Sequence, residues 1–112
     1  MKDNFNTSLL LDFYGNLLTE KQRDALDMYC NMDLSLGEIA EEIGVTRQGV
    51  RDTIKKGEER LLLFEEKVGM CSFAALIELE SAKIEKEISR FPEETKQNIL
   101  KSLSAIKNGM EI

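Results

Sequence analysis

The chain has 112 residues, 42% of them hydrophobic and 32% charged, which is the size and composition of one soluble globular domain. Its 21 acidic and 15 basic residues give a formal net charge of −6, which excludes a protein that coats nucleic acid through overall positive charge. The absence of histidine excludes imidazole-based catalytic triads and histidine-ligated metals, and a single proline favours helices over a turn-rich β fold.

The sequence carries no signal for membrane insertion, export or cofactor binding. The longest apolar stretch near its start, residues 9–18, is interrupted by Asp12 and Gly15 and is too short to span a bilayer or to act as a cleaved signal. Cys30 and Cys71 form neither a disulfide framework nor a zinc-binding pattern, and we expect both thiols to be buried. We therefore expect a cytoplasmic protein that stays out of membranes and uses no metal or cofactor.

Two amphipathic helices are predicted before residue 32. The first covers residues 7–16, because apolar residues recur there at the spacing of one helical face, namely Leu9, Leu10, Phe13, Tyr14 and Leu17. Thr19 and Gln22 match a capping box, which starts a second helix that ends near Asn31. Its expected inner face consists of Ala25, Leu26, Tyr29 and Cys30.

The next segment has the pattern of a helix, a three-residue turn and another helix. Ser35 and Glu38 form a capping box for a helix of about nine residues, whose inner face is Leu36, Ile39, Ala40 and Ile43. Gly44 supplies the left-handed residue that ends this helix, and Thr46 is a good N-cap for the next one. The inward residues of that helix are Val50, Ile54, Gly57 and Leu61. Ser35 to Lys56 is therefore predicted to be a helix-turn-helix.

The second helix of this unit carries the candidate nucleic-acid contacts, because in helix-turn-helix proteins its first turns enter a major groove about 12 Å wide. We expect Arg47, Gln48 and Arg51 to meet base edges, and Thr46, Lys55 and Lys56 to meet phosphates. Four cations and one anion lie between Thr46 and Lys56, so this surface is locally positive. The preceding helix carries three carboxylates that oppose that charge, namely Glu38, Glu41 and Glu42. Binding is therefore expected to be weak or partner-assisted. The alternative is a solvated face whose cations pair with carboxylates such as Glu58 and Glu59.

No enzyme site can be assembled from these residues. Gly44 and Gly49 have the spacing of a phosphate-binding loop, but Val50 and Arg51 stand where its lysine and its serine or threonine are required. Adjacent glutamates on a helix point about 100° apart, so we expect all such pairs to be solvated rather than catalytic. The pairs are Glu41 and Glu42, Glu58 and Glu59, Glu65 and Glu66, and Glu93 and Glu94. We expect no catalytic residue, because no nucleophile, base and oxyanion site can be combined.

The chain is predicted to be one domain, residues 1–112, with a helix-turn-helix core at 1–68 and a C-terminal helical arm at 69–112. Leu61 to Phe64 are four consecutive apolar residues that need cover from the first helix or from the arm. We expect Gly69 to break the long helix, Ser72 to cap the next, and a last helix to start with Pro92 in its first turn. The arm carries apolar residues at helical spacing, namely Phe73, Leu76, Ile77, Ile84 and Ile88. They form either an intramolecular core or a homodimer interface, and we favour the homodimer.

The order of these residues resembles a known family. Region four of sigma factors is similar to residues 18–61, with the sequence LTEKQRDALDMYCNMDLSLGEIAEEIGVTRQGVRDTIKKGEERL, above all in L-T-x-x-Q-R, E-I-A-E-x-x-G-V-T-R and E-x-R-L. With its flanking segments LLLDFYGNLLTEKQR and LLLFEEKVGM, the whole chain resembles the YlxM family of small bacterial helix-turn-helix proteins. Nothing in it matches a domain that binds core polymerase or the −10 promoter element, so we do not expect a sigma factor proper.

The resemblance implies an all-α fold and a gene neighbourhood shared with the signal recognition particle GTPase and its receptor. It also implies that Arg47, Gln48 and Arg51 occupy the positions that contact nucleic acid. Two hypotheses follow. The first is a nucleic-acid-binding regulatory protein of the signal recognition particle pathway, with DNA or the particle's RNA as its partner. The second is an accessory module that binds the signal recognition particle GTPase without contacting DNA.

Overall fold

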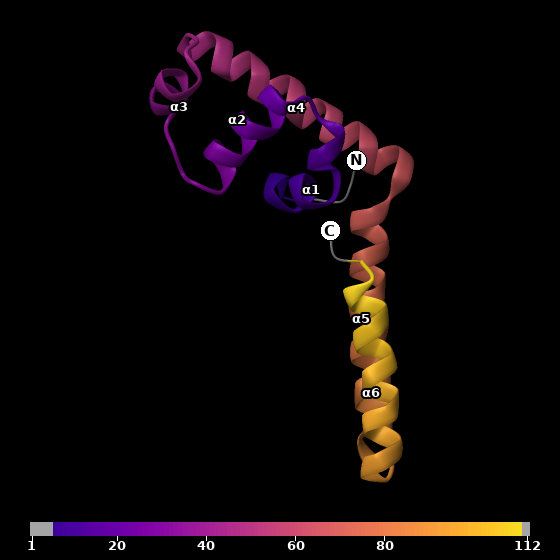
Figure 1. The fold of residues 1–112 in the computed structure, drawn as a ribbon. Coiled ribbons are helices and arrows are strands. Elements are labelled where there is room, and N and C mark those ends of the chain that lie inside the picture. The colour runs from indigo at the N-terminus through magenta and orange to yellow at the C-terminus, as the bar shows by residue number, and fades with distance from the viewer. Residues whose placement is uncertain (1–5, 111–112) are drawn as a thin grey trace. The chain divides into compact units, whose positions relative to one another are not determined.

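A computed structural model describes residues 6–110, in which all regular structure is helical and no strand occurs (Figure 1). This confirms the predicted all-α class. The helices divide into two compact units, Met1–Gly69 (unit 1) and Met70–Ile112 (unit 2). The α-helices are α1 Thr7–Tyr14, α2 Glu20–Cys30, α3 Leu36–Ile43, α4 Arg47–Val68, α5 Met70–Glu87 and α6 Glu93–Asn108, and two short 3₁₀ helices are η1 Gly15–Leu17 and η2 Ile88–Arg90.

The first helix is shorter than predicted and uses a different face. It ends at Tyr14, and the chain continues as the 3₁₀ helix η1. Leu10 and Tyr14 are buried as expected, but Leu9 and Leu17 are exposed and Leu11 is buried instead. A 3₁₀ helix has three residues per turn, so Leu17 leaves the α-helical register on which the prediction rested.

Helix α2 begins as predicted and packs closely against α4. The capping box is formed, with the Gln22 backbone N–H donating to Thr19 Oγ1 at 3.1 Å and the Thr19 N–H donating to Gln22 Oε1 at 3.3 Å. Leu26 is fully buried where the two helices meet. Gly57 of α4 permits this approach, because a Cβ atom there would lie 2.7 Å from Leu26 Cδ1. Tyr29, in the last turn of α2, is 45% exposed and so is not part of the core.

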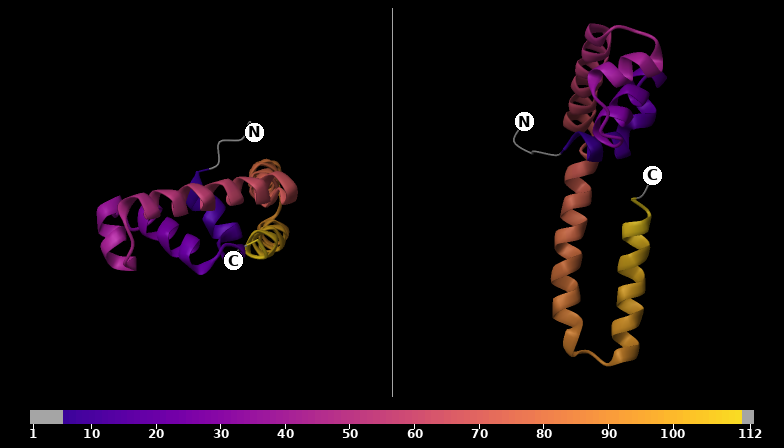
Figure 2. Two further views of the ribbon diagram at one scale, coloured as in Figure 1. Left: turned by 90° about the horizontal axis from the view of Figure 1, so that it is seen from above. Right: turned by 90° about the vertical axis from the view of Figure 1, so that its left-hand side faces the viewer.

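Helix α4 is the central helix of unit 1, and α1, α2 and α3 all pack against it (Figures 1 and 2). Its predicted inner residues are all buried, namely Val50, Ile54, Gly57 and Leu61. The expectation that the whole run from Leu61 to Phe64 is covered was wrong. Leu61 is buried and Phe64 packs beside the Tyr14 ring at a centroid distance of 6.0 Å, whereas Leu62 and Leu63 remain exposed. Four consecutive helical residues point in all directions, and α1 and α2 cover only one side of α4.

Glu65 corrects the expectation that every paired glutamate is solvated. It is only 3% exposed, and its Oε1 accepts a hydrogen bond from the Tyr14 hydroxyl at 2.7 Å. Glu65 follows Leu61 by four residues, so it lies on the buried side of α4. The tyrosine of α1 reaches it there, which is a tertiary contact that local spacing does not reveal.

Unit 2 is a hairpin of two antiparallel helices, α5 and α6, that lie side by side (Figure 2). Helix α5 begins at Met70, directly after Gly69, which ends α4 in the left-handed conformation at φ 76°. Ser72 is therefore inside the helix and is not its cap. Pro92 precedes the first helical residue of α6 instead of lying in its first turn. Cys71 is buried as predicted, Cys30 is partly exposed, and neither forms a disulfide with another described residue.

Candidate nucleic-acid interface

The turn between α3 and α4 is fixed by local hydrogen bonds. The Ser35 capping box starts α3, with the Glu38 N–H donating to Ser35 Oγ at 3.1 Å and the Ser35 N–H donating to Glu38 Oε1 at 2.8 Å. Gly44 ends α3 at φ 72°, where a residue with a Cβ would be strained. Thr46 then caps α4, its Oγ1 accepting from the Gly49 N–H at 3.0 Å. These bonds set the direction in which the first turns of α4 point.

All six candidate side chains are exposed on α4 or at its cap, and their partners differ. The set is Thr46, Arg47, Gln48, Arg51, Lys55 and Lys56. The Thr46 hydroxyl serves as the helix cap. The Gln48 side-chain amide donates to Asp52 Oδ1 at 2.9 Å, one turn later on the same helix. Both of these side chains already have a hydrogen-bond partner within α4.

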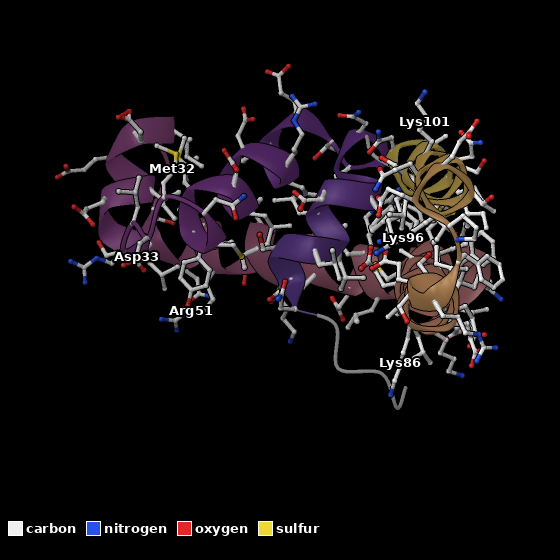
Figure 3. The ribbon with its side chains drawn as sticks, turned by 90° about the horizontal axis from the view of Figure 1, so that it is seen from below. Met32, Asp33, Arg51, Lys86, Lys96 and Lys101 are labelled. Atoms are coloured by element: carbon white, nitrogen blue, oxygen red, sulfur yellow. The ribbon has the colours of Figure 1, made fainter. Side chains whose placement is uncertain are left out.

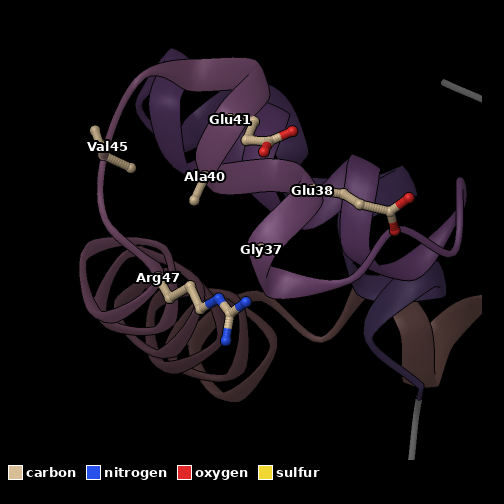
Figure 4. Close-up of a pocket in the computed structure, with 6 residues that line it drawn as sticks. All are labelled: Gly37, Glu38, Ala40, Glu41, Val45 and Arg47. Carbon is tan, nitrogen blue, oxygen red and sulfur yellow. The ribbon is translucent and has the colours of Figure 1, made fainter.

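Arg47 is directed towards the start of α3 and not straight outward. Its guanidinium lies under Gly37, and a Cβ atom at that glycine would be 3.1 Å from Arg47 Nε (Figure 4). Glu38 and Glu41 line the same shallow pocket, but their carboxylates point away from the guanidinium (Figure 4). Arg47 therefore braces α3 against α4 through packing, and within residues 6–110 it forms no ion pair.

Among the candidate contact residues, the cations that remain available are Arg51, Lys55 and Lys56. None of the ion pairs between described residues involves them, so the alternative of a surface neutralised by Glu58 and Glu59 finds no such contact. The side chain of Arg51 extends away from the ribbon (Figure 3). Arg51 and Lys55 are four residues apart and share one side of α4, whereas Lys56 points about 100° away from Lys55. The structure thus brings Arg51 and Lys55 together and places Lys56 on another flank.

The loop between α2 and α3 adds two exposed residues that sequence reasoning missed. Figure 3 shows Met32 and Asp33 at the same end of unit 1 as Arg51. Met32 is an exposed large apolar residue, and Asp33 has a left-handed backbone with φ 55°. An aspartate tolerates this conformation better than most residues, so the Asn-Met-Asp run after α2 was the available signal for a tight turn.

One carboxylate at this site has a shifted pKa. The pKa of Glu38 is lowered, first by the backbone N–H of Ser35 and then by the Ser35 side chain. Because these donors favour the ionised form, Glu38 stays negatively charged beside the cationic helix.

The described part of the chain contains neither a candidate metal site nor a helix suited to span a membrane. No cluster of three or more cysteine or acidic side chains in residues 6–110 could hold a metal ion. Among the helices of that range, none is both long and apolar enough to cross a membrane.

Comparison with known proteins gives the same class of fold. Residues 1–104 match the family model described as "Putative helix-turn-helix protein, YlxM / p13 like" (UPF0122). A UPF0122 protein of Thermoanaerobacter sp. (strain X514) is 45% identical over 105 residues, which cover 93% of this chain and 90% of the relative. A UPF0122 protein of Desulforamulus reducens is 51% identical over 72 residues, 64% of this chain. That match spans 62% of the relative's length, and the match to an Acetivibrio thermocellus relative spans 56%. The chain belongs to the UPF0122 family of YlxM / p13-like helix-turn-helix proteins.

Proposed function

We propose that this protein is a nucleic-acid-binding regulatory protein whose contact surface is the N-terminal half of α4. The observation that carries the proposal is that Arg51, Lys55 and Lys56 are exposed on a braced helix without a carboxylate partner among the described residues. Helix-turn-helix proteins present this part of their second helix to the major groove. Membership of a helix-turn-helix family supports the same class of function.

The contacts of each side chain suggest its role. Arg51 is the best candidate for a base edge, because its guanidinium is free to form two parallel hydrogen bonds with guanine. Lys55 and Lys56, on two flanks of the helix, are suited to phosphates on either side of a groove. Gln48 would have to exchange its bond to Asp52 for one to a base. Arg47 would keep its packing against α3 and act mainly as a nearby positive charge.

The test is a fluorescence anisotropy titration with duplex DNA and with structured RNA, at salt concentrations of about 50 and 200 mM. Arg51→Ala should weaken binding by about 1–3 kcal/mol if it contacts a base. Lys55→Ala should reduce the dependence on salt by about one counterion. Lys101→Ala is the matched control, because Lys101 is an exposed lysine on α6 without an ion pair to any described residue.

Two results would contradict the proposal. One is the absence of binding to both nucleic acids at low salt, where phosphate contacts are strongest. The other is a double change of Arg47 and Arg51 to alanine whose titration curves coincide with those of the wild type. Equal losses for Lys55→Ala and Lys101→Ala would show a non-specific charge effect and would also count against the assigned surface.

We also propose that the protein takes part in the signal recognition particle pathway, with the particle's RNA or its GTPase as partner. The resemblance to the YlxM family supports this pathway. The exposed carboxylates of Glu38 and Glu41 at the edge of α3 favour the protein partner, because Glu38 is held in its charged form. Pull-down with the purified GTPase and with its RNA tests both. Failure to retain either component would refute the assignment to this pathway.

The proposal includes a cellular context. Both candidate partners are cytoplasmic, so we propose a cytoplasmic location. The protein is proposed to act as one domain, residues 1–112. In this proposal the core at 1–68 contacts the nucleic acid and the arm at 69–112 forms a homodimer.

Helix-turn-helix families are typically non-enzymatic, and we propose that this protein has no catalytic activity. Purified protein should be a dimer without detectable hydrolase activity.

A further inference from the structure

Unit 2 leaves much of its apolar surface uncovered. Within its described residues, only Cys71, Ser81, Ile88 and Leu103 are buried. Six large apolar side chains are exposed, namely Phe73, Leu76, Leu79, Ile84, Phe91 and Ile106. Two antiparallel helices of this length rarely form a sufficient core, and exposed apolar patches of this kind mark interaction sites.

On α5, the apolar and acidic residues lie on opposite sides of the line that contacts α6. Ser81 marks this contact line, because it is a buried residue in the middle of α5. At about 100° per residue, Ile77 and Ile84 lie about 40–60° to one side of Ser81, and Phe73 lies slightly further round. Glu78 and Glu85 lie about 40–60° to the other side.

Helix α6 has the same division. Leu103 marks its contact line with α5, since it is the buried residue of α6. Ile99 and Ile106 lie about 40–60° to one side of Leu103, and Lys107 lies about 40° to the other. Lys107 Nζ is 3.7 Å from Glu78 Oε1 and 3.5 Å from Glu85 Oε2.

These ion pairs fix how the two helices are turned towards each other. Lys107 can reach both Glu78 and Glu85 only if the charged sides of α5 and α6 meet on the same face of the hairpin. The apolar sides must then share the opposite face. We name this surface the hairpin face; it consists of Phe73, Ile77, Ile84, Ile99 and Ile106.

We propose that the hairpin face packs against the hairpin face of a second copy of this chain, forming an antiparallel four-helix bundle. A two-fold axis in the plane of the interface places every helix beside an antiparallel neighbour, which is the arrangement of such bundles. The ion pairs of Lys107 remain in solvent on the outside. Glu80, at the edge of the face, is paired with Lys83 at 2.9 Å, so the rim is already neutralised.

The size of the hairpin face fits a second copy. Helix α5 has 18 residues and is therefore about 27 Å long. Two helices packed 8–10 Å apart present a face about 20 Å wide, so each copy offers about 500 Å² and the pair buries about 1,000 Å². A biological dimer interface needs about 1,000 Å² in total. The face is therefore large enough for a stable dimer only if it is buried over its whole length. A second copy of the same hairpin has the length to bury it completely.

The inference deepens the proposed homodimer and is independent of nucleic-acid binding. The experiment is therefore sedimentation equilibrium of the full chain without nucleic acid, from about 1 to 200 µM, a range that covers dissociation constants of weak and moderate dimers. Ile84→Glu places a carboxylate in the face, and Leu79→Glu is the matched control. Leu79 lies on the same helix and is more exposed, at 55% against 40%, but it points away from the face.

We expect the wild type and Leu79→Glu to be dimers with dissociation constants within about threefold, and Ile84→Glu to raise the constant at least about 100-fold, because the carboxylate would be buried without a partner. Ile106→Glu, on the other helix, should do the same. Unchanged helicity by circular dichroism separates this result from unfolding. A wild type that is monomeric throughout overturns the proposal. Equal effects of Ile84→Glu and Leu79→Glu overturn the assigned face.

Discussion

Replacing Tyr14 with phenylalanine removes the hydroxyl that donates to Glu65 Oε1 at 2.7 Å and keeps the ring that packs beside Phe64. When a buried acceptor loses a hydrogen-bond donor, the free energy of unfolding falls by about 1–3 kcal/mol. Glu65 is 3% exposed, so water cannot easily replace the lost donor. We expect Tyr14→Phe to lower the free energy of unfolding by about 1–3 kcal/mol, which lowers the Tm by at least about 4 °C for a unit of this size.

The assay is urea and thermal unfolding followed by circular dichroism, with Tyr29→Phe as the matched control. Tyr29 is 45% exposed, and in the described residues no hydrogen bond to its hydroxyl is formed. Its replacement should change the free energy of unfolding by less than about 0.5 kcal/mol. If both variants unfold at the same urea concentration, Glu65 does not depend on Tyr14 and the argument for a buried carboxylate held by α1 is wrong.

Three further predictions concern the contact between α2 and α4, the N-cap of α3, and Cys30. Gly57→Ala should lower the free energy of unfolding by about 1 kcal/mol in urea, because overpacking against Leu26 outweighs the gain in helix propensity; a gain in stability would contradict the close approach. Ser35→Ala removes the N-cap of α3 and should lower stability by about 1 kcal/mol. The folded state lowers the pKa of Glu38, so its contribution is present above about pH 4.3 and is lost as the pH falls through the folded pKa. Ser35→Ala removes only the side-chain cause and keeps the backbone N–H, so the pH dependence of unfolding should become shallower without disappearing. A profile identical to that of the wild type would refute the contribution of the side chain. Burial, followed by nearby carboxylates, raises the pKa of the Cys30 thiol. Alkylation by iodoacetamide, followed by mass spectrometry, should be slower at pH 7 than for a cysteine peptide, and equal rates would disprove it.

The helix boundaries were the most predictable feature of this chain. The caps at Thr19 and Ser35 and the stop at Gly44 are formed as expected, because each depends on hydrogen bonds within three or four residues. Boundaries that lack such a signal were placed less well. The start of α5 at Met70 follows from the left-handed Gly69 next to it, and a serine two residues later was mistaken for the cap.

The candidate site was predictable in its residue types but not in its contacts. Exposure of Arg51, Lys55 and Lys56 follows from helical periodicity once the buried face of α4 is known. The position of Arg47 under Gly37 does not follow from it, since it depends on how α3 crosses the start of α4. From the sequence alone, these cations cannot be told apart. The packing shows that Arg47 braces α3, whereas Arg51, Lys55 and Lys56 remain available for a partner.

Periodicity, caps and composition by themselves determined that the chain is helical, where most helices begin and end, and which residues surround the turn before α4. These features depend on neighbours a few positions apart, so they are written in the local order of residues. Only the tertiary structure decided that Glu65 is buried, that Gly57 admits Leu26, and that the apolar residues of α5 and α6 share one face. Each of these depends on which side of one helix meets another, and residues distant in the sequence determine that choice.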